Sequence, residues 1–298
     1  MTNITIIAGP CSVDKNNLHE IDEILSIKIN GKKAIAGTRV VGLKSRTILE
    51  TSGEGMGIDF DVYMHNCDIL INGGNSNDFE NLPSILMAKE IQEKHNCIIA
   101  TEVMNPAIQM PQLEKHLKGI VMPWNPSVNQ LGWSELYISK YCEKNNWFLG
   151  IKNPKDLGET IVDSEVNNIT APMERVWKGI ASYSNLENKK KILIHRGINS
   201  EIKSDFRNDL VHKAAMRTKT SIAEAKMFFD PSHSCGPKLR DKIVEITIEA
   251  MKMKCVDGSN LYDGILVEVG TSVTDTKQHI TIDELETLVN ELSKFREL

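Results

Sequence analysis

The sequence predicts a (β/α)8 barrel, in which eight parallel strands close into a ring and a helix follows each strand. Three observations favour this fold. Short apolar runs alternate with helical patterns along the chain, as βα units feeding a parallel sheet require. The runs number eight, and the 298 residues suit a barrel that typically needs about 250. Chemically active side chains follow the first, seventh and eighth runs, and a closed barrel brings those strand ends together on one rim.

The strands are expected at the apolar runs, residues 3–9, 34–41, 97–103, 119–124, 148–152, 190–195, 226–230 and 264–269. The helices are expected between and after them, at residues 17–29, 82–95, 106–117, 133–146, 172–185, 207–219, 239–256 and 281–296. Pro106 and Pro172 stand where the first turn of a helix tolerates proline. A doubly wound open sheet would show the same alternation, but eight units is the number of the barrel.

Residues 50–81 are too many for an ordinary connection of about 2–6 residues. We expect an elaborated loop there, with room for a small hairpin, inside a single domain spanning residues 1–298. Gly53, Gly55 and Gly57 invite a phosphate-loop interpretation. However, no Lys-Ser/Thr pair follows them and no strand directly precedes them, so a lid is favoured.

Composition excludes several classes of function. A net charge of −5 gives no electrostatic reason to expect nucleic acid as a partner. No apolar run reaches the roughly 18–20 residues that cross a bilayer, and no basic region precedes the apolar stretch near the N-terminus. The six cysteines lack CxxC spacing and the density of a disulfide framework. We therefore expect a cytoplasmic protein without a membrane partner.

Four side chains at or just beyond strand ends are candidate metal ligands: Cys11, His233, Glu268 and Asp275. Singly, each has a structural explanation as a buried thiol, a loop residue, a carboxylate at the core edge or a turn residue. Together on one rim they suit a divalent transition metal, Mn, Fe, Co or Zn. Their sulfur and nitrogen atoms argue against magnesium and calcium, which prefer oxygen.

Five cations form a candidate anion site at strand ends. Arg39, Lys44 and Arg46 lie in GTRVVGLKSRT (37–47), Lys152 ends the fifth predicted strand, and Arg196 follows the sixth. Solvated surface charges are the usual alternative, but these residues stand at strand ends rather than on outer helix faces. A metal beside such a cluster suggests a phosphorylated substrate with an electrophilic carbonyl.

Eight short motifs follow one another along the chain in the order GPCS, RVVGLKSRT, TEVM, GIKN, HRGI, DPSHS, DGILVEVG and TDTKQ. In this order they resemble the class I 3-deoxy-D-arabino-heptulosonate 7-phosphate (DAHP) synthases. That superfamily includes the 3-deoxy-octulosonate 8-phosphate (KDO8P) synthases. The resemblance runs from residue 6 to about 290. It implies a transferase that condenses phosphoenolpyruvate with erythrose 4-phosphate and releases phosphate, the first step of the shikimate pathway to aromatic amino acids.

The resemblance also implies roles for particular residues. Cys11, His233, Glu268 and Asp275 match the metal ligands, and Arg39, Lys44, Lys152 and Arg196 match residues that hold phosphoenolpyruvate. Arg46 and Thr47 fall in the segment that receives the aldose phosphate, and Asp230 lies where it would contact the aldehyde-bearing substrate. Lys44, Lys152 and His233 are the expected catalytic residues. By analogy, a homo-oligomer, a dimer or a tetramer, is expected.

Two other functions stay open. The fourth-strand segment reads MPWNPSVNQ (122–130), without the arginine that the family carries there, and His195 replaces the glutamate before RGI. A related synthase acting on another phosphorylated aldose, such as arabinose 5-phosphate, fits this departure. A noncatalytic barrel that serves as a binding or regulatory partner is the third interpretation. Separately, Cys235 lies two residues beyond His233, so oxidation could pair Cys11 with Cys235 and expel the metal.

Overall fold

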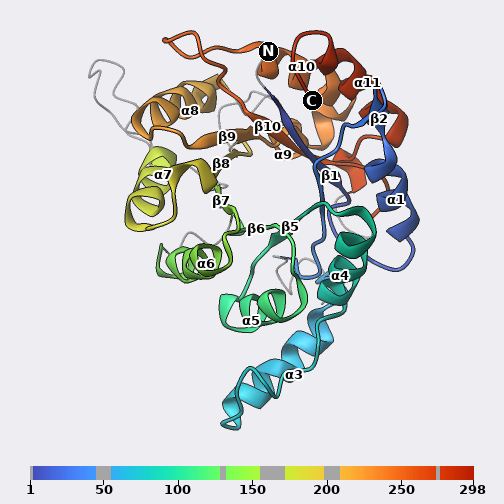
Figure 1. Cartoon of the computed structure of the whole chain (residues 1–298), viewed down its shortest axis with the longest axis vertical. Coiled ribbons are helices and arrows are strands. Elements are labelled where there is room, and N and C mark those ends of the chain that lie inside the picture. Colours follow the sequence, from blue (N-terminus) through green and yellow to red (C-terminus); the bar gives the residue numbers. More distant parts are fainter. Residues whose placement is uncertain (1–2, 45–54, 128–131, 155–171, 198–208, 273–275) are drawn as a thin grey trace.

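A closed barrel of eight parallel strands forms the centre of the computed structural model (Figure 1), which describes residues 3–44, 55–127, 132–154, 172–197, 209–272 and 276–298. The strands are β1 (Thr5–Gly9), β4 (Gly37–Arg39), β5 (Ile98–Glu102), β6 (Val121–Trp124), β7 (Leu149–Lys152), β8 (Lys191–His195), β9 (Lys226–Phe229) and β10 (Gly264–Glu268). Strand β1 pairs with β4 on one side and with β10 on the other, which closes the ring. The predicted fold is confirmed, and each of the eight predicted strands coincides with one of these.

Helices surround the barrel, as Figure 1 shows. They are α1 (Leu18–Ser26), α3 (Phe60–Ile71), α4 (Pro83–His95), α5 (Pro106–His116), α6 (Gly132–Asn145), α7 (Pro172–Tyr183), α8 (Asp209–Ser221), α9 (Pro231–Cys235), α10 (Ile243–Lys252) and α11 (Ile282–Ser293). The described residues also form three short 3-10 turns, η1 (Asn188–Lys190), η2 (Pro237–Lys242) and η3 (Thr276–Gln278). Pro106 and Pro172 open α5 and α7 as expected.

Three predicted segments differ from the structure. The helix expected at 17–29 ends at Ser26, and a two-stranded hairpin of β2 (Lys28–Ile29) and β3 (Lys32–Lys33) follows it. Asn30 and Gly31 turn this hairpin with φ of 51° and 77°, the backbone that an Asn-Gly pair favours in a two-residue turn. The helix expected at 239–256 is shorter because Leu239 leaves helical geometry, and α10 begins at Ile243.

The hairpin suggested within residues 50–81 is wrong. The described part of that segment carries the twelve-residue helix α3, which projects away from the barrel in Figure 1. No glycine or proline interrupts the chain between Ile58 and Asn72, so nothing there breaks a helix. Only Asn66 of α3 is buried. Residues 45–54, which include Gly53, lie outside the described residues.

Two apolar layers fix which side chains enter the barrel. An inner cluster fills the barrel, with contributions from Ile7, Val41, Ala100, Met122, Trp124, Ile192, Ile194, Phe228 and Leu266. A larger outer cluster packs between the strands and the helices. Because side chains alternate along a strand, a residue two positions beyond an inner one also faces inward. Glu268 follows the inner Leu266 in this way, and so points into the mouth of the barrel.

No helix in the described part of the chain is both long enough and apolar enough to cross a membrane.

Candidate active site

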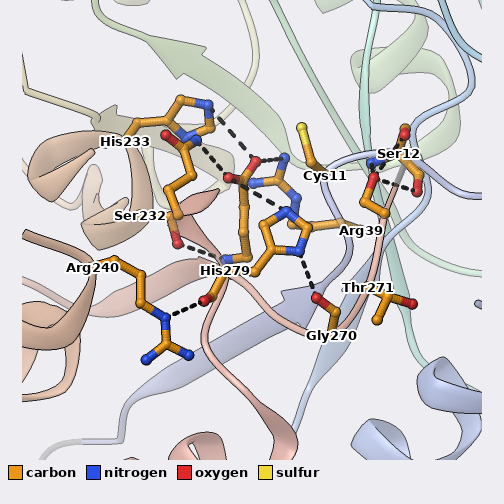
Figure 2. Close-up of polar contacts among 12 residues, drawn as sticks. Cys11, Ser12, Arg39, Ser232, His233, Arg240, Gly270, Thr271 and His279 are labelled. Atoms are coloured by element: carbon orange, nitrogen blue, oxygen red, sulfur yellow. Dashed lines mark hydrogen bonds and ion pairs between the residues drawn. The ribbon is translucent and has the colours of Figure 1, made fainter. Parts of the chain in front are cut away.

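A polar cluster at the carboxyl ends of the strands brings Arg39, His233 and His279 together (Figure 2), and each of them lies beside Glu268. Glu268 is fully buried at the end of β10. Its Oε1 accepts a 2.8 Å hydrogen bond from Nη2 of Arg39, and its Oε2 accepts one of 2.7 Å from Nε2 of Gln278. The imidazoles of His233 and His279 flank the same carboxylate, with Nε2 atoms 3.8 Å from Oε1 and 3.9 Å from Oε2. Elements far apart in sequence therefore meet at one carboxylate.

His233 is oriented by the local geometry of the DPSHS segment. Asp230 caps the short helix α9 by accepting a 3.1 Å hydrogen bond from the backbone N–H of His233, and Pro231 occupies the first turn. The Asp230 carboxylate also lies 3.0 Å from Nδ1 of the His233 ring. This contact keeps the proton on Nδ1 and directs Nε2 toward Glu268. Ser232 links the two segments, because its Oγ accepts a 2.9 Å hydrogen bond from the Glu268 backbone N–H.

Cys11, Glu268 and His279 can hold a metal ion, since one ligand atom from each lies within 4.8 Å of the others. Gly9 pairs with Glu268 at the seam between β1 and β10, so Cys11, two residues beyond Gly9, arrives beside that carboxylate. All three residues are buried. A thiolate, a carboxylate and an imidazole suit a divalent transition metal. The predicted ligand His233 is not in this group, although its Nε2 lies 3.8 Å from Oε1 of Glu268. His279 was not predicted, because a histidine beyond the last strand carries no motif that marks it as a ligand.

Four of the predicted cations are buried, and three of them, Arg39, Lys44 and Lys152, each lie beside a buried carboxylate. Arg39 contacts Glu268, Nζ of Lys44 lies 3.6 Å from Oε2 of Glu102, and Nζ of Lys152 lies 3.0 Å from Oδ2 of Asp230. Glu102, which lies in the TEVM motif, was not predicted as a site residue. The pairing shows that these cations belong to a built polar interior rather than to a solvated surface.

Electrostatics keep these carboxylates ionised. Burial alone would raise the pKa of Glu268, but the neighbouring positive charges, Arg39 among them, hold it well below its usual value. The pKa of Asp230 is likewise held well below its usual value, because the charges of Lys152 and Arg39 and the hydrogen bond from the His233 ring outweigh the effect of burial. Burial lowers the pKa of His233, which favours the neutral imidazole that binds metals.

Asparagines at strand ends hold the backbone of two of the cations, Lys152 and Arg196. The backbone N–H of Lys152 donates to Oδ1 of Asn125 at 2.9 Å, and the Asn125 amide returns a 3.1 Å hydrogen bond to the Lys152 carbonyl. In the same way the backbone N–H of Arg196 donates to Oδ1 of Asn153 at 2.7 Å. These bonds join β6 to β7 and β7 to β8. They hold in place the backbone from which the side chains of Lys152 and Arg196 extend.

The segment that lacks the expected arginine places Trp124 inside the barrel. The guanidinium of Arg39 lies 5.6 Å from the centre of this ring and the ammonium of Lys152 lies 5.7 Å from it. Trp124 is fully buried and belongs to the inner apolar cluster. It thus offers a cation–π platform beneath two of the cations and adds no charge of its own.

His195, the other departure from the family motif, lies away from the candidate metal ligands. Its ring packs against Phe229, which belongs to the outer apolar cluster, and its Nδ1 lies 2.6 Å from the hydroxyl of Tyr262. The same hydroxyl lies 2.6 Å from Nδ1 of His212 on α8. His195 is therefore part of the packing between the barrel and its helices.

Three predicted site residues, Arg46, Thr47 and Asp275, lie outside the described residues. The six cysteines, all described, carry reduced thiols, so the oxidative Cys11–Cys235 pairing stays a prediction. When the chain was compared with protein-family models and with curated proteins, none matched.

Proposed function

We propose that this protein is a metal-dependent synthase that condenses phosphoenolpyruvate with a phosphorylated aldose and releases inorganic phosphate. Erythrose 4-phosphate is the aldose we expect, which would make the product DAHP. The observation that carries the proposal is the meeting of two sets of buried groups in one barrel mouth. Cys11, Glu268 and the two imidazoles form one set, and Arg39, Lys44 and Lys152 form the other.

The balance of charge supports an anionic substrate. Three buried carboxylates, Glu268, Glu102 and Asp230, accompany the buried cations Arg39, Lys44 and Lys152. Arg196, which is 6% exposed and directly follows β8, is a fourth buried cation. A bound metal would add further positive charge, which would favour a substrate with a carboxylate and a phosphate.

A divalent metal bound beside Cys11 and Glu268 would supply Lewis-acid polarisation of the aldehyde oxygen. The protein's own side chains would hold the two reactants. Arg39 and Lys152 would clamp the carboxylate and phosphate of phosphoenolpyruvate above Trp124, and the carboxylate of Asp230 would keep His233 in its Nδ1–H form. Fixing both reactants removes much of the entropic barrier to a bimolecular reaction.

Phosphate release from phosphoenolpyruvate, measured with a panel of aldose phosphates, tests the proposal. We expect release with erythrose 4-phosphate in the metal-loaded protein and loss of release after treatment with a chelator. Activity only with arabinose 5-phosphate would reject the expected aldose, and no activity with any aldose would favour the noncatalytic barrel.

The second candidate is the related synthase that acts on another aldose phosphate, and Trp124 is the observation that favours it. An indole in place of a guanidinium removes a charged donor and adds volume to the mouth. A pocket changed in this way would bind the phosphate of the aldose at a different position. The homo-oligomeric state that the resemblance implies stays a prediction.

A further inference from the structure

We propose that His279 is a direct ligand of the metal, a role that neither the motifs nor the resemblance assigns to it. The inference rests on the proposed function, because it concerns the same metal in the same barrel mouth. His279 follows η3, beyond the last barrel strand, and is 4% exposed. A nitrogen of its ring belongs to the group whose ligand atoms lie within 4.8 Å of one another, together with Cys11 and Glu268.

The tautomer of His279 is fixed in the form that a metal requires. Its Nδ1 lies 2.8 Å from the carbonyl oxygen of Gly270 (Figure 2). A carbonyl oxygen can only accept, so Nδ1 carries the proton and the lone pair is on Nε2. Nε2 is also the atom that lies 3.9 Å from Oε2 of Glu268. A backbone carbonyl that holds the far nitrogen of a ligating histidine is a common arrangement in metal sites.

The position of His279 is built by several contacts around it. Its backbone carbonyl accepts a 2.8 Å hydrogen bond from Nε of Arg240, and Arg240 also pairs with Glu284 of α11. The next residue, Ile280, bridges to Val269, so the returning chain lies alongside the end of β10. The ring is therefore held from both its backbone and its Nδ1, as a preorganised ligand requires.

His279 and His233 stand on opposite oxygens of Glu268 in equivalent orientations. Each holds its Nδ1 proton on an oxygen acceptor and turns Nε2 toward the carboxylate. His279 would add an imidazole to the ligands predicted from sequence, so the set becomes richer in nitrogen. Such a set favours zinc, cobalt or ferrous iron over manganese, which prefers oxygen ligands.

A pair of substitutions separates ligation from structural support. In His279→Asn, the amide nitrogen falls near the place of Nδ1 and can still donate to Gly270, but nothing replaces Nε2. In His279→Gln, the longer side chain puts an amide oxygen near the place of Nε2, where it can still bind a metal. His116→Asn on α5 is the control, because His116 contacts Asn81 and is remote from the site in sequence and in its contacts.

Metal binding is measured without substrate, by titrating the metal-free protein with Co²⁺ and recording its visible and thiolate charge-transfer absorption. We expect His279→Asn to weaken Co²⁺ binding at least tenfold, since altering even the partners of metal ligands typically costs about 10–100-fold. The spectrum should change in His279→Asn, and His279→Gln should fall between it and the wild type. Unchanged affinity and spectrum in His279→Asn would overturn the proposal.

X-ray absorption at the cobalt edge provides a second readout, because it counts the imidazoles bound to the metal. His279→Asn should bind cobalt with one imidazole fewer than the wild type does. An unchanged number of bound imidazoles in the variant, or none in the wild type, would contradict the proposal. These outcomes are independent of turnover. If the protein released no phosphate with any aldose but lost an imidazole in His279→Asn, the proposed function would fail and the ligand assignment would stand.

Discussion

At the scale of single residues, the site depends on charges that compensate one another out of contact with water. Arg39 and Glu268 are 1% and 0% exposed and form a 2.8 Å ion pair. Removing one member of a buried pair leaves the other charge uncompensated, which costs much more than the pair contributes in total. The same carboxylate lies beside the candidate metal ligands, so it has both a structural and a chemical role.

Glu268→Gln should therefore destabilise the metal-free protein by on the order of 3–5 kcal/mol. The measurement is chemical denaturation in the presence of a chelator, so that lost metal binding does not contribute. Glu114→Gln is the matched control, because Glu114 pairs with the exposed Lys144 at 2.8 Å and such a pair contributes only about 0–1 kcal/mol. Equal losses of stability in the two variants would contradict this view of the pair.

At the scale of elements, the eight strands could be predicted from sequence because each is a short apolar run between polar segments. The helix α3 could not, since only Asn66 in it is buried and apolar periodicity therefore gives a weak signal. The β2–β3 hairpin had a signal in Asn30 and Gly31, but the preceding helical pattern masked it.

The same distinction applies to the candidate site. Cys11, His233 and Glu268 could be predicted because they follow strands directly and so share a rim. His279 could not, because its place depends on the return of the chain along β10 and on the Gly270 carbonyl. The sequence showed only that the segment containing Trp124 lacks an arginine. The structure adds that the Trp124 ring lies against the charged groups of Arg39 and Lys152.

A buried acid, Asp59, lies where the N-terminus of α3 meets that of α4, and its titration can be measured. Asp59, fully buried, accepts hydrogen bonds from the backbone N–H of Ser84 at 2.8 Å and from its Oγ at 2.5 Å. Burial raises the pKa of Asp59 to about 6, although the Ser84 bonds act in the opposite direction. The folded protein therefore holds this proton more tightly than the unfolded chain does.

The sign of the pH effect follows from that difference. Asp59 disfavours folding where it is ionised in both states, above pH 6, and this cost disappears as the pH falls toward the unfolded pKa of about 4. Relative to Asp59→Asn, the wild type should gain about 2 kcal/mol of unfolding free energy between pH 7.5 and 4.5. Denaturation of both proteins across this range is the measurement. Parallel stability curves would show that Asp59 has an ordinary pKa.

At the scale of the whole molecule, the candidate metal site lies across the seam that closes the barrel. Cys11 follows β1, Glu268 ends β10, and five residue pairs join these two strands from Thr5 and Gly264 to Gly9 and Glu268. A metal bound there would join the first strand to the last and would be lost on unfolding. Binding should therefore stabilise the closed barrel, and above Kd the gain should rise with the logarithm of the metal concentration.

Adding zinc or cobalt to the metal-free protein should raise its melting temperature. At a free metal concentration 100 times Kd the gain is about 2.7 kcal/mol, or roughly 4 °C for a chain of this size. Cys11→Ser should reduce the shift strongly, because a hydroxyl is a much poorer ligand than a thiolate. The measurement is a thermal melt followed by circular dichroism. An undiminished shift in Cys11→Ser would show that the metal binds elsewhere.

The position of the seam also has a consequence for how the protein is made. Cys11 is synthesised near the beginning of the 298-residue chain, and Glu268 and His279 near its end. At a translation rate of about 5–20 residues per second, the thiol waits on the order of tens of seconds before its partners exist. During that interval Cys11 lacks the carboxylate and the imidazole that complete the candidate site. A metal held there would therefore be acquired only after β10 has been made, and a ribosome that stalls earlier would leave Cys11 on an open sheet.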